Sequence, residues 1–406
     1  MESTQTEAGP YRWVVLVLWM VCHGTGWAAV FTIGILLPSI ASEFQLSYLQ
    51  QGILSSAPVW ANVALTIPLS VWVTRYSPTT LTAVTLALGV LGILLQASSV
   101  WFVFLLVSRL AFGITMAARE PARAMLTQQW FTAGEFMRAN GITAGILSFV
   151  FAGLILATPP LLNASSNDWR TTMYLIGGFS ALLTILWAIL GRDRVKANQS
   201  RPTGRMANPL GPVLRHKQLW MAGLGMLGAN MTFSCFFAFY PTLMLDRFHF
   251  ALGYSGAILA LAFLAGGVTS MAIGRIATNW QSRPRFLYLF GFLMVGTSLG
   301  LIVTDSLPLL FSIAVLNGIA WGFFPILLTV PFHLPGIRIH EVPVAYAVLL
   351  TVVSLGLALG PPLAGLLQEG LENMVMVFVV MSLLSLSVTT SGIFLRGLEE
   401  NKVSTM

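Results

Sequence analysis

The chain has 406 residues, of which 56% are hydrophobic and only 9% are charged. Because soluble proteins carry about 25% charged residues, this composition excludes a soluble globular protein and predicts a polytopic membrane protein. The two cysteines, Cys22 and Cys235, both fall in apolar segments and support neither a disulfide framework nor a metal site.

The first apolar run, from Trp13 to about Ile40, predicts a membrane-spanning helix, because it is too long to be the hydrophobic core of a signal peptide. Runs of about 18–28 apolar residues then recur along the chain, and each is long enough to cross about 30 Å of hydrocarbon. These runs predict twelve transmembrane helices at 13–38, 49–74, 80–98, 101–128, 137–158, 170–190, 218–245, 253–278, 286–304, 307–331, 342–367 and 374–396.

The longest polar stretch divides these helices into two sets of six. It predicts an N-terminal six-helix bundle (1–190), a basic cytoplasmic linker (191–217) and a C-terminal six-helix bundle (218–406). The halves are weakly alike, since three residues of the first recur in the second at an offset of 203 or 204 residues: Pro38, Glu43 and Gly52 match Pro241, Asp246 and Gly256. Internal repeats of this kind are typical of secondary transporters.

The basic residues predict the orientation of the chain. Of the 21 Lys and Arg residues, Arg170 and Arg247 fall in predicted outer loops, Arg109 and Arg119 fall within the membrane, and all others fall on the predicted inner side. This asymmetry places both termini in the cytoplasm. The basic linker then serves orientation and contact with lipid headgroups, and it needs no nucleic-acid partner.

The fourth predicted helix combines an apolar sequence with charges, at Arg109, Arg119, Glu120 and Arg123. A charge near the bilayer centre costs roughly 2.5–3.5 kcal/mol on insertion scales, so such side chains face a polar cavity or a partner. The spacing from Arg109 through Met116 and Glu120 to Arg123 forms one stripe on a helix, with Arg119 to one side. We expect other helices to pack around this stripe.

Each of these charges has two interpretations. Arg109 could bind an anionic substrate through its guanidinium, or it could bond to carbonyls and polar groups of neighbouring helices. Glu120 could carry a proton, or it could form a gating ion pair with Arg123 and Arg119. Arg123 lies near the inner end, where reaching out to the interface is the simpler interpretation. We expect Arg119 to act at a gate or at the substrate.

His23 in the first helix is an alternative proton site, because its imidazole can titrate near neutral pH. Its other interpretation is a satisfied polar residue at a close helix contact. Trp27 lies one helical turn away on the same face, and the repeat offset relates it to Asn230 in the seventh helix.

Helix four also carries sequence patterns of a known family. Arg109 to Gly113, then Trp130, Phe131 and Glu135, resemble the Arg-x-x-x-Gly and Trp-Phe-Pro-x-x-Glu-Arg patterns of bacterial members of the major facilitator superfamily. Twelve helices as six plus six and the basic linker add to this resemblance, which is nearest to the organic anion–cation symporter branch. The chain departs from that branch at Met116, Thr132 and Phe136, which replace its usual Glu, Pro and Arg.

The family's loop motif after the second helix survives only in part. Arg75 remains in the first copy, and Gly274 and Arg275 remain in the second, which lacks the family's Asp. In the family this loop helps to lock the inner face. The resemblance therefore implies a cytoplasmic loop role for these three residues and the major facilitator fold, in which two six-helix bundles are related by a pseudo-two-fold axis.

In this superfamily, helices one, four, seven and ten line the central cavity. By resemblance, the substrate-binding candidates are Arg109, Trp27, Asn230, Ser234, Asn317 and Trp321, and the coupling or gating candidates are Glu120, Arg119, Arg123 and His23. Ser234 is the repeat counterpart of Phe31, while Asn317 and Trp321 lie one turn apart in helix ten near the counterpart of Arg109.

The resulting hypothesis is a monomeric secondary active transporter in the bacterial inner membrane. It imports a small, carboxylate-like organic anion by alternating access, coupled to a proton. The alternative is an exporter of amphipathic or cationic compounds, in which Glu120 contacts the cation. The sequence contains no Ser-His-Asp set, metal cluster or nucleotide-binding loop, so we expect neither an enzyme nor a cofactor.

Overall fold

The computed structural model describes residues 9–73, 76–131, 135–194, 210–276, 283–338 and 341–403, and all regular elements in these ranges are helices. The first half contains α1 (Tyr11–Phe44), α2 (Tyr48–Val73), α3 (Pro78–Ala97), α4 (Phe102–Trp130), α5 (Phe136–Ala164) and α6 (Trp169–Leu190). The second half contains α7 (Leu210–Leu214), α8 (Lys217–Phe248), α9 (Leu252–Ile276), α10 (Arg283–Val303), α11 (Leu307–Ala320), α12 (Phe323–Leu328), the 3₁₀ helix η4 (Val330–His333), α13 (Val342–Leu371), α14 (Met374–Leu383) and α15 (Leu386–Val403).

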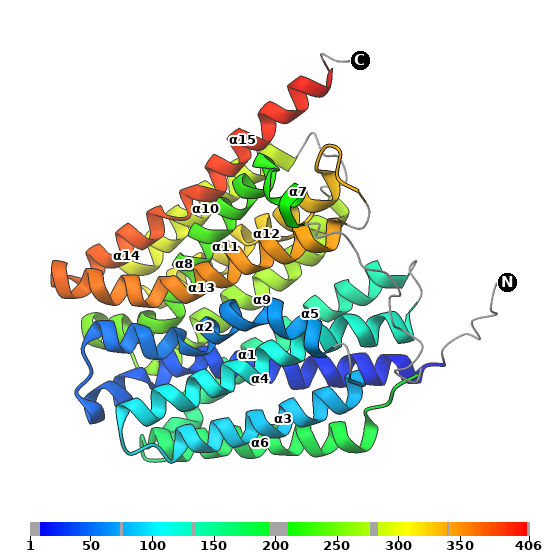
Figure 1. Cartoon of the computed structure of the whole chain (residues 1–406). Coiled ribbons are helices and arrows are strands. Elements are labelled where there is room, and N and C mark those ends of the chain that lie inside the picture. Colours follow the sequence, from blue (N-terminus) through cyan, green and yellow to red (C-terminus); the bar gives the residue numbers. More distant parts are fainter. Residues whose placement is uncertain are drawn as a thin grey trace.

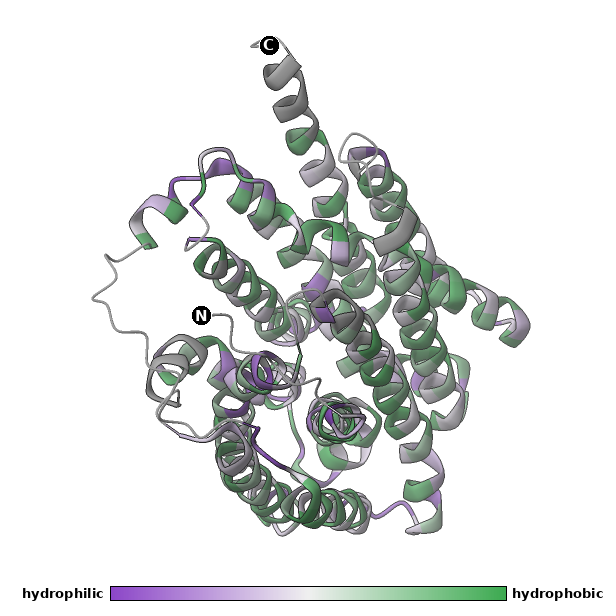
Figure 2. Cartoon of the chain, turned by 90° about the vertical axis from the view of Figure 1, so that its right-hand side faces the viewer, coloured by the Kyte–Doolittle hydropathy of each residue, from purple (hydrophilic) through white to green (hydrophobic). Residues whose placement is uncertain are grey.

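The expected helices are present in the expected order. Within the described ranges, eleven helical segments are long and apolar enough to cross a membrane; α2 has 26 residues but is not among these eleven. Several helices run further than predicted, and α1 continues through Pro38 to Phe44. Figure 2 shows hydrophobic residues along the helices and hydrophilic residues mainly at helix ends and connections.

Two predicted helices are interrupted, and the predicted linker contains the short helix α7. The expected helix 307–331 is divided into α11, α12 and η4, because Pro325 has no N–H and its ring would clash with the carbonyl of Trp321. The expected helix 374–396 is divided at Leu384 and Ser385. There the Ser385 hydroxyl donates a hydrogen bond to Thr232 of α8, at 2.9 Å.

The two halves of the chain occupy different parts of the molecule. In Figure 1, α1 to α6 lie in the lower part and α8 to α15 in the upper part, and the two groups diverge toward the side that holds the chain ends. We call this the terminal end and the other the distal end. The arrangement as two six-helix bundles related by a pseudo-two-fold axis stays a prediction.

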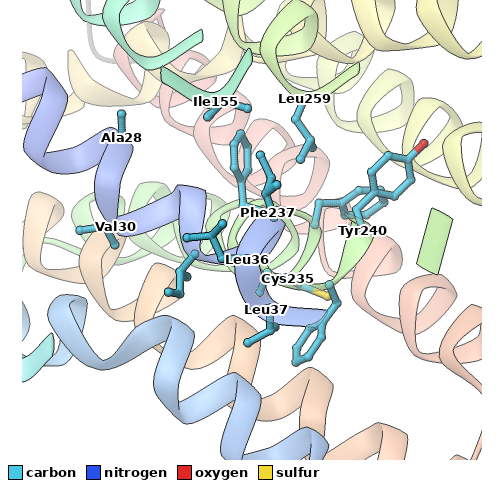
Figure 3. Packing of buried hydrophobic residues seen from close by; sticks show 14 of the residues in the cluster. Ala28, Val30, Leu36, Leu37, Ile155, Cys235, Phe237, Tyr240 and Leu259 are labelled. Atoms are coloured by element: carbon cyan, nitrogen blue, oxygen red, sulfur yellow. The ribbon is translucent and has the colours of Figure 1, made fainter. Parts of the chain in front are cut away.

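The halves meet most closely at the distal end, where α13 packs on α2. A Cβ atom on Gly52 would lie 2.3 Å from the carbonyl oxygen of Pro361, and one on Gly365 would lie 2.3 Å from that of Tyr48. Only glycine permits so close an approach of two helix backbones. A buried core of α1, α5, α8 and α9 residues continues this contact, with Leu36, Ile155, Phe237 and Leu259 among its members (Figure 3).

Candidate functional site

The two candidate proton sites form one pair, of which His23 is buried and Glu120 is partly exposed. His23 of α1 is 4% exposed, and its Nε2 lies 3.2 Å from Oε1 of Glu120 on α4. The ring of Trp19 stacks on the imidazole with a centroid distance of 4.6 Å and holds it in place. The Glu120 side chain is 33% exposed. The sequence offered His23 and Glu120 as alternatives, and the structure instead brings them together.

Arg119 completes this pair from the neighbouring position of α4. Its Nε lies 3.4 Å from Nδ1 of His23, and its Nη2 contacts the thioether sulfur of Met116. A Cβ atom on Gly26 would lie 2.8 Å from this Nη2, so the glycine makes room for the guanidinium. The spacing of Arg119 and Glu120 on one helix therefore places an arginine and a carboxylate on opposite nitrogens of the same imidazole.

Trp27 connects this cluster to the interface between the halves. Its indole Nε1 lies 3.1 Å from Nε2 of His23, and its ring stacks on Phe31 with a centroid distance of 6.3 Å. Phe31 contacts Phe233 and Phe237 of α8, each at 5.4 Å.

The aromatic cluster continues into the second half. Phe233 lies 4.9 Å from the ring of Trp321, and Phe151 of α5 stacks on Phe263 of α9 at 4.2 Å. Trp321 was predicted from the sequence as a binding residue, whereas Phe151, Phe233 and Phe263 were not. A usable signal is the i, i+4 spacing of aromatic residues in α1 (Trp27 and Phe31) and in α8 (Phe233 and Phe237).

Arg109 is fully buried, with 0% exposure. Its Nε donates to the carbonyl of Leu54 at 2.7 Å, its Nη1 to Gln96 at 3.2 Å, and its Nη2 to the carbonyls of Val30 and Ser55 at 3.2 Å each. These contacts tie α1, α2 and α3 to α4 and favour the packing alternative for Arg109. All four acceptors are neutral, so they take up four of its five N–H donors without neutralising its charge.

A small cavity lies directly beside these carbonyls, between α1, α2, α8 and α13. Its lining includes Val30, Phe31, Ser55, Ser56, Ser234 and Pro361. The Ser55 hydroxyl is buried and has no hydrogen-bond partner within the described part of the chain. A buried hydroxyl without a partner is costly unless a ligand or water satisfies it.

The remaining candidate residues differ in whether they line this cavity. Ser234 lines it, while the amide of Asn230 donates to the carbonyl of Met226 in its own helix at 2.7 Å. Asn317 is directed toward α10, where it donates to Thr297 at 2.9 Å and not into the cavity. Arg123 is partly buried and lines a second small pocket with Arg12 near the terminal end.

The cytoplasmic loop motif lies mostly outside the described residues. Arg75 lies outside the described residues, and only the α9 backbone is described at Gly274 and Arg275. Glu135, which belongs to the motif after helix four, has a clear partner: its carboxylate lies 2.8 Å from the Arg12 guanidinium at the start of α1. This motif residue therefore joins the terminal ends of α1 and α5.

Comparisons with known proteins agree with this architecture. The human protein named "Monocarboxylate transporter 11" is 27% identical over 416 residues, which cover 97% of this chain and 84% of that protein. The Bacillus subtilis "Uncharacterized transporter YybO" is 22% identical over 303 residues, or 68% of this chain and 67% of that protein.

Solved structures show the same fold. A bacterial homologue of the human lysosomal transporter Spinster, in an inward-facing and unoccupied conformation, superimposes with a TM-score of 0.74 and 17% identity over 95% of both chains. The nucleoside transporter NupG superimposes with a TM-score of 0.75 and 13% identity over 95% of this chain and 99% of that one.

The sequence model of the Major Facilitator Superfamily matches residues 16–339, which is most of the chain. Transporters of this family are multi-pass membrane proteins that bind small molecules within the membrane. The chain therefore belongs to the Major Facilitator Superfamily and is an integral membrane transporter rather than an enzyme, as its sequence predicted.

Proposed function

We propose that this transporter carries a small carboxylate-bearing organic anion, coupled to a proton. Two six-helix halves, 1–190 and 218–406, alternate about a central site and are joined by the linker 191–217. Both termini face the cytoplasm of a bacterial inner membrane, and the monomer is the working unit. The proton binds at the His23–Glu120 pair.

The observation that carries this proposal is the uncompensated charge of Arg109 beside an interhelical cavity. Two of its four hydrogen-bond acceptors, the carbonyls of Val30 and Ser55, belong to residues that line the cavity. A buried cation without a counter-charge is unfavourable, and its field is weakly screened in a low-dielectric interior. A carboxylate in the cavity would supply the missing charge, and the free Ser55 hydroxyl can donate to it.

The cavity also limits the size of the ligand. In this conformation it leaves room for little more than one water molecule, well below the roughly 300–1,000 Å³ of sites for drug-sized molecules, so it favours a small ligand and must widen to admit one. The name of the human relative, a monocarboxylate transporter, is in keeping with a small organic acid. Arg119 lies ten residues further along α4, about 15 Å nearer the terminal end, and gives the anion a second, separate binding position there.

Thermal unfolding of the purified protein tests this proposal, with carboxylates, phosphonates, sugars and lipophilic cations as ligands. A bound ligand at a hundredfold excess over its Kd adds about 2.7 kcal/mol to the free energy of unfolding. We expect this gain with a small carboxylate. Ser55→Ala removes one hydrogen bond to the ligand and weakens binding about tenfold, since a hydrogen bond to a charged group contributes about 1.5 kcal/mol or more.

The control variant is Ser180→Ala in α6, whose hydroxyl donates to the carbonyl of Ile176 within its own helix. It should bind the carboxylate as the wild type does. Arg109→Gln should abolish binding even where the variant remains folded. Carboxylate binding of normal strength in both Ser55→Ala and Arg109→Gln contradicts the proposed site.

The alternative function is the export of an amphipathic or cationic compound. The partly exposed Glu120 carboxylate and the aromatic cluster around Trp27 and Phe233 favour it, because aromatic faces bind cations. Under this alternative only lipophilic cations stabilise the protein. Glu120→Gln then abolishes the effect while Ser55→Ala leaves it unchanged.

A further inference from the structure

Two hydrogen-bond donors compete for the ring of His23. The Nε of Arg119 lies 3.4 Å from Nδ1, and the Nε1 of Trp27 lies 3.1 Å from Nε2. The guanidinium N–H and the indole N–H can only donate, whereas a neutral imidazole has one protonated nitrogen and one bare nitrogen. The ring can therefore accept from Arg119 or from Trp27, but not from both at once.

The position of the ring proton decides which donor is accepted. When Glu120 is ionised, its carboxylate, 3.2 Å from Nε2, requires a donor, so the ring proton resides on Nε2. Nδ1 is then bare and accepts the N–H of Arg119. In this state His23 holds the guanidinium in place, and the Trp27 N–H faces a protonated nitrogen.

One additional proton reverses the arrangement. It yields either an imidazolium beside the carboxylate or a neutral ring that accepts from the carboxyl hydroxyl of Glu120. In both cases Nδ1 carries a proton, and this proton points at the N–H of Arg119. Two facing donors repel, so the contact between His23 and Arg119 breaks. When the carboxyl keeps the proton, the single lone pair of Nε2 accepts from the Glu120 hydroxyl or from Trp27, but not from both.

We propose that His23 is a proton-operated switch that releases Arg119 to bind the transported carboxylate. Once Nδ1 is protonated, the remaining hydrogen-bond partner described for Arg119 is the Met116 sulfur, which is a weak acceptor. A carboxylate offers the guanidinium two charged oxygens and binds it far better. Anion binding and proton uptake therefore favour each other, because such coupling is reciprocal. This inference rests on the proposed transport of a carboxylate.

Other groups around the His23–Glu120 pair do not change which donor faces Nδ1 of His23. Arg123 of α4 and Tyr346 of α13 lie within electrostatic range of Glu120, and Cys22 lies near Arg119. From α5, Leu147 and Val150 approach the α1 backbone at Gly24 with apolar side chains. These neighbours shift the pH at which the pair gains its proton, but His23 Nδ1 still faces Arg119 in every case.

Binding measured against pH tests the switch on the full-length protein in detergent, with monocarboxylates from acetate to benzoate as probes. Uptake of one proton with each anion makes the affinity rise about tenfold for each pH unit that the pH falls. His23→Gln cannot titrate and should reduce this dependence to less than about twofold per pH unit while still binding the anion. His333→Gln, at an exposed histidine of η4, is the matched control and should keep the full dependence.

A second measurement separates this inference from the proposed function. Nitrogen NMR of labelled histidine, with the His23 signals assigned by their loss in His23→Gln, reports which ring nitrogen bears the proton. We expect a bare Nδ1 at high pH, which gains a proton as the pH falls. In Arg119→Gln the neutral ring should shift toward the Nδ1-protonated form.

The outcomes are distinct. If a carboxylate binds but the pH dependence survives in His23→Gln, the switch is refuted and the proposed function stands. If no carboxylate binds at any pH, the proposed function fails and the switch fails with it, whatever the NMR result. A neutral His23 ring that carries its proton on Nδ1 in the wild type overturns the switch whatever the binding shows.

Discussion

The glycine contact between α2 and α13 gives the sharpest test of which state this structure represents. A Cβ atom added at Gly52 would lie 2.3 Å from the carbonyl oxygen of Pro361 and 2.9 Å from Cα of Pro362. Favourable contacts between carbon atoms begin near 3.5 Å, so Gly52→Ala must push the two backbones apart by about 1 Å at the distal end. The variant therefore disfavours the conformation that is closed at this end.

The size of the effect follows from the cost of overpacking, about 1–3 kcal/mol. Both sides of the contact are backbone, which places the cost in the upper part of that range. A difference of 1–3 kcal/mol changes a two-state equilibrium by about 5–150-fold. The helix-forming advantage of alanine applies to both conformations and cancels from their ratio.

Distances between two spin labels measure this equilibrium. Labels at Gln50 of α2 and Leu371 of α13 occupy exposed positions at the distal end, and the native Cys22 and Cys235 are buried. Gly52→Ala should move the distance distribution toward longer values. The control is Gly178→Ala in α6, where an added Cβ meets no atom within 4 Å. Identical distributions in the two variants would refute the argument.

Two further contacts give smaller predictions. The Glu369 carboxylate of α13 accepts a hydrogen bond from the backbone N–H of Leu49 at the start of α2, at 3.0 Å. Glu369→Ala removes this acceptor and should lengthen the distance between the same two spin labels. Glu369→Gln keeps an acceptor and should leave that distance unchanged. The Asp168 carboxylate caps α6, so Asp168→Ala should cost about 0.5–2 kcal/mol of unfolding free energy, measured as a lower Tm. The Thr171 hydroxyl and the backbone N–H groups of Arg170 and Thr171 lower the pKa of Asp168, so its stabilisation is complete above about pH 4 and is lost as the pH falls through the lowered pKa. A Tm difference between wild type and Asp168→Ala that grows on acidification would contradict this sign.

The helices were predictable because hydrophobic length is a local property of the sequence. The order of the elements and the position of the linker followed from it, and the break before Pro325 could also be anticipated from the missing N–H. The break at Leu384 could not, because no Gly or Pro marks it. It coincides with a hydrogen bond from Ser385 to Thr232, and residues 153 apart in sequence carry no local signal.

The candidate site was predictable in its residue types but not in its pairings. Charges inside apolar helices identified Arg109, Arg119 and Glu120, because such residues need partners in a membrane. Their actual partners lie on other helices: Arg109 reaches Leu54 and Val30 carbonyls, which any residue type would supply. Backbone acceptors leave no mark in a sequence, so side-chain patterns alone could not decide between binding and packing for this arginine.

The contacts between the halves differ in kind along the helix axes, and this difference constrains any movement between them. At the distal end, backbone meets backbone at Gly52 and Gly365, and such a contact is lost after a separation of about 1 Å. Nearer the centre, Phe31 touches Phe233 and Phe237 through ring faces and edges, which can slide and tilt while they stay in contact. A transition that opens the distal end must therefore break the glycine contacts outright, whereas the aromatic contacts can persist through it. Because Trp27 joins this aromatic cluster to His23, a change of hydrogen bonding at the proposed proton site would reach the interface between the halves.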